Sequence, residues 1–189
     1  MAEVVLYHHV QGLTDGVRAF ADELRRAGHT VHTPDVFDGR TFATIDEGLA
    51  YARDAGFGTL VERGVAAADA VAAESVYAGF SFGVMMAQQL AQTRPGARGA
   101  ILMYSCLPVS EFGSWPAGVP VQVHGKEADE FFLEDLGAAR ALVETTDDAE
   151  LFLYPGDEHL FADSSLPAYD EAAAKLLLER VLAFLSRSA

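Results

Sequence analysis

Short β-prone runs alternate with longer stretches of helical periodicity along the chain. The short runs are rich in aliphatic, aromatic and β-branched residues and predict strands at residues 4–7, 29–33, 75–78, 100–104, 121–124 and 151–154. Between them, apolar side chains recur with a period of about 3.6 and predict helices at residues 15–27, 44–72, 84–92, 131–144 and 169–185. Gly56 and Gly58 are expected to interrupt the second of these helices.

Six strands separated by helices predict a doubly wound α/β fold of three layers, in which helices cover both faces of a mostly parallel sheet. Most strand runs are apolar throughout, as in strands that are buried on both faces. Neither an internal repeat nor a biased linker interrupts the pattern, so residues 1–189 are expected to form a single domain. In such sheets, ligands bind beyond the carboxyl ends of the strands, so a site is expected among the residues that follow the strands.

The charge of the chain narrows its possible partners. The 13 Lys and Arg residues are outnumbered by 28 Asp and Glu residues, which gives a formal net charge of -15. A surface this acidic repels phosphate backbones and anionic lipids, so neither nucleic acid nor a membrane is an expected partner. No apolar run suits a signal peptide or a membrane span, and Cys106 has no second cysteine for a disulfide. We therefore expect a soluble cytoplasmic protein, either a monomer or a homodimer.

The junction between the strand at 75–78 and the helix at 84–92 carries the clearest chemical signal. It reads Gly79-Phe80-Ser81-Phe82-Gly83, a G-x-S-x-G pattern between a strand and a helix. In that context the serine lies on a sharp turn, where glycines relieve crowding and the helix N-terminus favours negative charge. Ser81 is therefore the predicted nucleophile, and a simple helix-capping role is the alternative interpretation.

A serine hydroxyl needs a general base, and His159 is the best candidate among the six histidines. It lies in the loop after the strand at 151–154 and follows Ser81 in the chain order serine, acid, histidine that is typical of these hydrolases. The alternative is that His159 is an ordinary histidine of a surface loop.

The acid that orients this histidine is expected after the strand at 121–124. Asp129 is the predicted acid, and Glu127 and Glu130 in the same loop are its competitors. In a chain this acidic, a solvated surface carboxylate is the simplest alternative for any of the three.

Two backbone N–H groups are expected to form an oxyanion hole. One belongs to Phe82, directly after the predicted nucleophile, and the other comes from the loop after the first strand, near His9 and Val10. The adjacent pair His8 and His9 also suggests a metal site, but no carboxylate or third histidine accompanies the pair at a ligand spacing. A metal is therefore not expected.

Three stretches of the chain resemble the dienelactone hydrolase family of α/β-hydrolases. They are the elbow at 79–83, His124-Gly125-x-x-x-Asp129, and Pro155-Gly156-x-x-His159-x-Phe161. The opening of the chain, from Leu6 to Asp35, is also similar, so the resemblance covers nearly the whole sequence. It implies a minimal α/β-hydrolase fold without a lid domain, a triad of Ser81, Asp129 and His159, and Val10 as the second oxyanion donor.

The chain departs from this family pattern at its charged and nucleophilic positions. The family nucleophile is typically a cysteine in G-x-C-x-G-G, whereas this chain has Ser81 and ends the pattern with Val84. The family glutamate before the oxyanion donor corresponds to His9, and its substrate-binding arginine corresponds to Asp163. We therefore expect a neutral or cationic ester, lactone or thioester as the substrate rather than dienelactone.

These features together predict a serine hydrolase that works through an acyl-enzyme intermediate and needs no metal or organic cofactor. The candidate substrate-facing residues are His9, Tyr104, Cys106 and Phe161. For Cys106, the alternative is a small buried apolar residue. For the whole chain, the alternative is a small-molecule binding protein on a hydrolase scaffold with little or no turnover.

Overall fold

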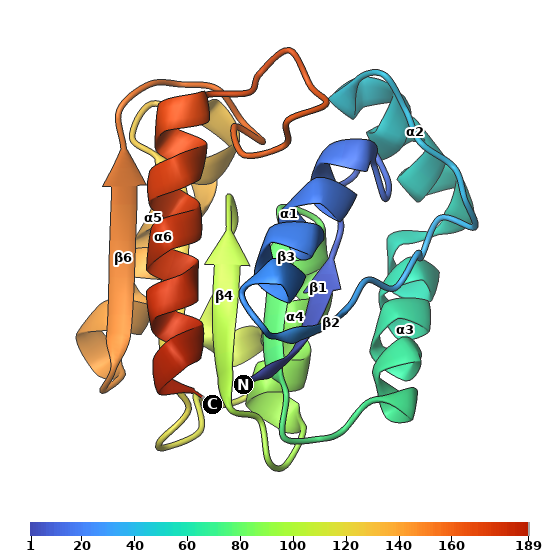
Figure 1. The fold of residues 1–189 in the computed structure, drawn as a ribbon. Helices are drawn as coiled ribbons and strands as arrows, with labels where there is room; N and C mark the ends of the chain where they lie inside the picture. Colours follow the sequence, from blue (N-terminus) through green and yellow to red (C-terminus); the bar gives the residue numbers. More distant parts are fainter. Residues whose placement is uncertain (189) are drawn as a thin grey trace.

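The computed structural model describes residues 1–188 and contains one six-stranded sheet between two layers of helices (Figure 1). Every pair of neighbouring strands is parallel, and the strand order is β2-β1-β3-β4-β5-β6. The strands are β1 Glu3–Tyr7, β2 Thr30–His32, β3 Val76–Phe80, β4 Gly99–Met103, β5 Val121–Lys126 and β6 Ala149–Tyr154. The predicted three-layer doubly wound α/β fold is thus confirmed.

Helices cover both faces of the sheet. They are α1 Asp15–Arg26, α2 Ile45–Ala55, α3 Phe57–Ala67, α4 Gly83–Thr93, α5 Glu130–Thr145 and α6 Glu171–Arg187, with short 3₁₀ turns at Ala68–Ala70 and Val109–Glu111. One buried apolar cluster joins α1 and α6 to one face, and a second joins α2, α3, α4 and α5 to the other. No helix within residues 1–188 is both long and apolar enough to cross a membrane.

Local features explain where two of the helical stretches begin and end. The stretch at 44–72 forms two helices, as expected, because Gly56, with a φ of 85°, ends α2 and precedes α3. The last helix begins at Glu171 instead of residue 169, since the Asp170 carboxylate accepts a hydrogen bond from the Ala173 N–H and caps its N-terminus.

The carboxyl ends of the strands form one edge of the sheet. Because all six strands run in the same direction, the loops after β1, β3, β5 and β6 come together there. Each of the residues predicted for the triad and the oxyanion hole lies in or directly after one of these four connections.

Candidate active site

The turn between β3 and α4 holds Ser81 in an unusual backbone conformation. Its φ is 49°, in the left-handed region that non-glycine residues rarely adopt. The Ser81 N–H donates a hydrogen bond of 2.6 Å to the carbonyl oxygen of Met103 on the neighbouring strand. This bond holds the strained turn in place, as is common for backbone outliers at functional sites.

The glycines of the G-x-S-x-G pattern are required by close backbone packing. A Cβ atom added to Gly79 would lie 2.4 Å from the carbonyl carbon of Gly83, so the two ends of the turn are in direct contact. No larger side chain fits at Gly79 without opening the turn that presents Ser81.

His159 lies between a hydroxyl and a carboxylate that come from distant parts of the chain. Its Nε2 is 2.9 Å from Ser81 Oγ and its Nδ1 is 2.6 Å from Asp129 Oδ2. The imidazole therefore accepts the Ser81 O–H at Nε2 and donates its Nδ1–H to Asp129. The sequence-predicted serine, acid and histidine are brought together in one hydrogen-bonded row, and the histidine is 9 % exposed.

Asp129 serves two purposes in this arrangement. It is the N-cap of α5, where its Oδ1 accepts the Phe131 N–H at 3.0 Å, while Oδ2 accepts the hydrogen bond from His159. Its side chain is buried, whereas the competing carboxylates Glu127 and Glu130 are exposed to solvent. The cap fixes the carboxylate on a rigid helix end and leaves its second oxygen for the imidazole.

A buried lysine supports the loop that leads to His159, and the sequence offered no signal for it. Lys126 Nζ donates hydrogen bonds to Glu158 at 2.5 Å and to Asp170 at 2.8 Å. Burial alone would lower the pKa of Lys126, but the bonds to Asp170 and Glu158 outweigh it and raise the pKa. The same bonds hold the pKa values of the Glu158 and Asp170 carboxyls below their ordinary range. The ion pairs tie the loop before His159 to the end of β5 and the start of α6.

Two aromatic rings contact the imidazole. Tyr104 meets His159 edge to face at a centroid separation of 5.6 Å, and Phe131 lies over it at 4.8 Å. Phe131 is 48 % exposed, so it forms part of the surface beside His159.

The two predicted oxyanion donors also lie at this edge. Val10 follows β1, and Phe82 follows Ser81 after the adjacent strand β3. Within residues 1–188, neither the Val10 N–H nor the Phe82 N–H donates a hydrogen bond to another atom of the chain. Both N–H groups are therefore unpaired in the described part of the chain, as an oxyanion hole requires.

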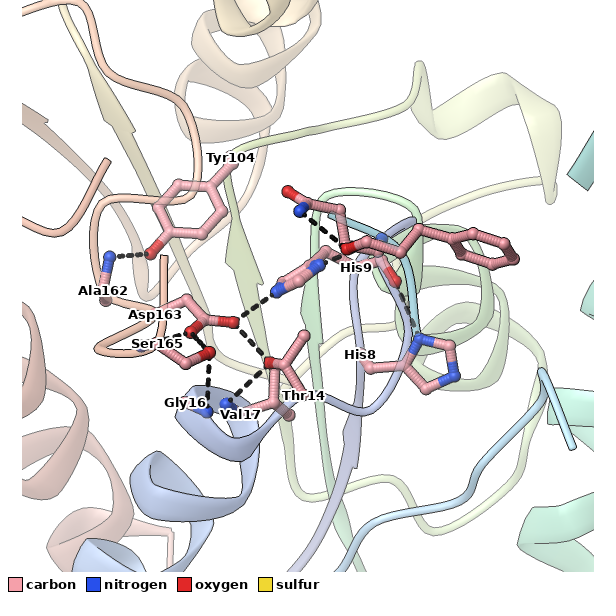
Figure 2. A network of polar contacts seen from close by, with 11 residues as sticks. His8, His9, Thr14, Gly16, Val17, Tyr104, Ala162, Asp163 and Ser165 are labelled. Atoms are coloured by element: carbon pink, nitrogen blue, oxygen red, sulfur yellow. Dashed lines mark hydrogen bonds and ion pairs between the residues drawn. The ribbon is translucent and has the colours of Figure 1, made fainter. Parts of the chain in front are cut away.

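The adjacent histidines point to opposite sides of the loop after β1 (Figure 2). His8 donates from Nδ1 to the His9 carbonyl at 2.8 Å and accepts the Val36 N–H at Nε2. Burial lowers the pKa of His8 to about 4, so this ring is neutral at pH 7. Within residues 1–188, no cluster of three His, Cys, Asp or Glu side chains is arranged to hold a metal ion.

His9 forms a hydrogen bond with Asp163, although nothing in the sequence links these two positions. The distance from His9 Nε2 to Asp163 Oδ2 is 2.7 Å, and both side chains are almost completely buried. The residues are 154 positions apart, so no local pattern reveals the contact.

The other candidate substrate-facing residues also lie below the surface. The Tyr104 hydroxyl accepts the Ala162 N–H at 2.9 Å, and the Phe161 ring packs against Tyr104. Cys106 is buried on the opposite face of the sheet, and burial raises the pKa of its thiol to about 12. Contact of any of these residues with a substrate remains a prediction.

Comparison with known proteins identifies a family. The model of the dienelactone hydrolase family matches residues 1–189. No curated protein matches the chain.

Several solved structures share the fold. A protein of Xanthomonas campestris, described as a hydrolase of the alpha/beta superfamily, is 27 % identical, with a TM-score of 0.65 over 97 % of this chain and 99 % of that one. The dienelactone hydrolase-like promiscuous phosphotriesterase P91 from metagenomic libraries is 19 % identical, with a TM-score of 0.74 over 99 % and 86 %. The dienelactone hydrolase of Anabaena variabilis is 17 % identical, with a TM-score of 0.71 over the same shares.

Proposed function

Because the chain belongs to the dienelactone hydrolase family, we propose that it is a serine hydrolase that cleaves a small carboxylic ester, lactone or thioester. The observation that carries the proposal is the hydrogen-bonded row from Ser81 Oγ through His159 to Asp129. In this proposal, one domain over residues 1–189 supplies the nucleophile, the base, the orienting acid and both oxyanion donors.

The first half of the reaction forms an acyl-enzyme. Ser81 Oγ bonds to the substrate carbonyl carbon while His159 Nε2 takes the hydroxyl proton. The carbonyl electron pair moves to oxygen, which accepts hydrogen bonds from the N–H groups of Val10 and Phe82. Asp129 stabilises the imidazolium through the Nδ1–H bond. The tetrahedral centre then expels the alcohol or thiol, which takes the proton from Nε2.

The second half repeats these steps with water. His159 takes a proton from a water molecule whose oxygen bonds to the acyl carbon. The resulting tetrahedral centre breaks its bond to Ser81 Oγ, which recovers the proton from His159. The carboxylic acid leaves, and the side chains return to their starting protonation states.

The charges around the site support a neutral or cationic substrate. At the position where the resemblance implies a substrate-binding arginine, the chain has Asp163, and its carboxylate is buried and paired with His9. The net charge of -15 adds a long-range repulsion of anions. Phe131 offers an apolar surface beside His159 for the leaving group or the acyl chain.

The test is the intact mass of the protein after treatment with a fluorophosphonate, together with hydrolysis of a chromogenic short-chain ester. The wild type is expected to gain one adduct, Ser81→Ala none, and His159→Ala and Asp129→Ala to react at least 100-fold more slowly. Acyl-CoA esters in the same assay separate a thioesterase from an esterase.

A folded wild type that gains no adduct, and whose ester turnover equals that of Ser81→Ala, contradicts the proposal. It would favour a binding protein on a hydrolase scaffold.

A further inference from the structure

The imidazole of His9 has a defined protonation state. Its Nδ1 accepts the Gln11 N–H at 3.2 Å, so the ring proton resides on Nε2. That proton is donated to Asp163 Oδ2 at 2.7 Å. His9 therefore links the loop after β1 to the loop after His159.

Asp163 collects hydrogen bonds from three segments. Its Oδ2 also accepts the Thr14 hydroxyl, and its Oδ1 accepts both the N–H and the hydroxyl of Ser165. Burial alone would raise the pKa of Asp163, but the bonds from His9, Ser165 and Thr14 outweigh it and lower the pKa. The side chain is thus a carboxylate with every acceptor direction in use.

This carboxylate lies against the N-terminus of α1 (Figure 2). Thr14 caps the helix by accepting the Val17 N–H, and the Ser165 hydroxyl accepts the Gly16 N–H. The positive end of the helix dipole favours the negative charge of Asp163 at this place. A Cβ atom added to Gly16 would lie 1.7 Å from Asp163 Oδ1, so the carboxylate packs directly on the helix backbone.

Resting on the proposed function, we propose that His9 and Asp163 are positioning residues for the oxyanion hole. The bond from the Gln11 N–H to the His9 ring closes around Val10, so it fixes the direction of the Val10 N–H. Asp163 anchors that ring to α1 and, through its own N–H bond to the Leu160 carbonyl at 3.0 Å, to the loop of His159. One buried pair thereby holds an oxyanion donor and the general base in register.

Measured effects in other enzymes indicate how far kcat falls when an oxyanion donor is removed or misplaced. Removal of one oxyanion donor typically lowers kcat by about 10²–10³-fold, and a misplacement of about 1 Å costs about 10²-fold. Asp163→Ala leaves Val10 in place but releases its loop, so kcat is expected to fall by about 10–100-fold while KM changes little.

The kinetic test uses ester hydrolysis by His9→Ala, Asp163→Ala and the double variant. Because the two residues act as one unit, the double variant is expected to lose no more kcat than either single variant. Asp163→Asn is expected to recover much of the loss, since one amide oxygen still accepts from His9. His124→Ala is the matched control, because His124 is equally buried but bonded to Tyr154. It is expected to lower stability without lowering kcat.

A second measurement does not depend on activity. The ¹⁵N shifts of His9 are expected to report a neutral ring protonated at Nε2. Amide hydrogen exchange at Gln11 is expected to accelerate at least tenfold in Asp163→Ala and to stay unchanged in His124→Ala.

Each result decides the matter. Wild-type kcat in a folded Asp163→Ala variant, additive losses in the double variant, or a proton on Nδ1 of His9 would refute the positioning role. If the wild type neither hydrolyses esters nor reacts at Ser81, the proposed function fails by itself. The rate of amide hydrogen exchange at Gln11 then tests by itself whether Asp163 holds the loop of Val10. An unchanged rate in Asp163→Ala would refute this structural link.

Discussion

Gly83 of α4 packs directly on the carbonyl group of Tyr7 at the end of β1. A Cβ atom added to Gly83 would lie 2.5 Å from the Tyr7 oxygen, and the His8 carbonyl oxygen would lie 2.8 Å away. Both obstacles are backbone atoms, which cannot move aside as a flexible side chain can. The first turn of the helix after Ser81 and the start of the loop after β1, which holds Val10, are therefore in van der Waals contact.

Gly83→Ala is expected to destabilise the protein by about 1–3 kcal/mol, since overpacking here displaces backbone. Gly137→Ala is the matched control, because Gly137 lies in α5 with open space around its Cβ position. That variant is expected to gain about 0.5–1 kcal/mol from helix propensity. Urea denaturation of both variants measures the two effects, and equal stabilities would contradict the close packing.

Asp129→Asn separates the proposed catalytic role of Asp129 from its capping role. Asparagine still caps α5, so the midpoint of unfolding should change little. The asparagine amide carries no negative charge that could stabilise the imidazolium of His159, so kcat is expected to fall by about 10⁴-fold. Glu127→Gln, at an exposed carboxylate of the same loop, should retain wild-type kcat. Similar kinetics for the two variants would argue against Asp129 as the acid.

Lys126→Met is expected to reduce the acid sensitivity of the protein. The pKa values of Glu158 and Asp170 are lowered from 4.5 and 3.8 by Lys126. Their contribution to stability is complete above these ordinary values and is lost as the pH falls through the lowered folded-state values. The melting temperature of the wild type should therefore fall more steeply below about pH 4.5 than that of Lys126→Met.

Lys175→Met removes the same charge from an exposed position of α6 and should keep the wild-type slope. If the melting temperatures of the wild type and Lys126→Met depend on pH in the same way, the ion pairs of Lys126 do not make the stability pH-dependent.

Cys106 is expected to resist alkylation while the protein is folded. Its thiol is buried, and with a pKa of about 12 only about one molecule in 10⁴ is a thiolate at pH 8. Iodoacetamide should modify the native protein at least 100-fold more slowly than the unfolded protein, as followed by intact mass. Rapid modification of the native state would place the thiol within reach of solvent and favour its predicted role as a substrate contact.

The sequence predicts the central strands of the sheet well because β3, β4 and β5 are buried. The run at 100–104 is apolar throughout, and β4 lies in the middle of the sheet with neighbours on both sides. The strand at 121–124 is predicted too short, since β5 continues to Lys126. A charged residue normally ends such a run, and only its distant carboxylate partners explain how it is buried.

The parts of the site that follow from chain order were predictable, and those that depend on remote pairing were not. Ser81, Asp129 and His159 each follow a strand, so the parallel topology brings them to one edge. The sequence predicts His9 as a substrate contact and shows Asp163 as a departure from the family pattern, with nothing to link the two residues. Hydrophobic periodicity reports local structure only, so it contains no information on a contact between these two residues.

The order of the strands has a consequence for the newly made protein. The proposed general base of Ser81 is synthesised well after the serine, because His159 is 78 residues further along the chain. At roughly 5–20 residues per second, the ribosome adds those residues in about 4–16 s. During that interval the serine has neither its base nor the Asp163 anchor. On the proposed function, a growing chain that still lacks His159 is therefore expected to be catalytically silent, and reactivity toward a fluorophosphonate would mark the moment at which the loop of His159 has docked.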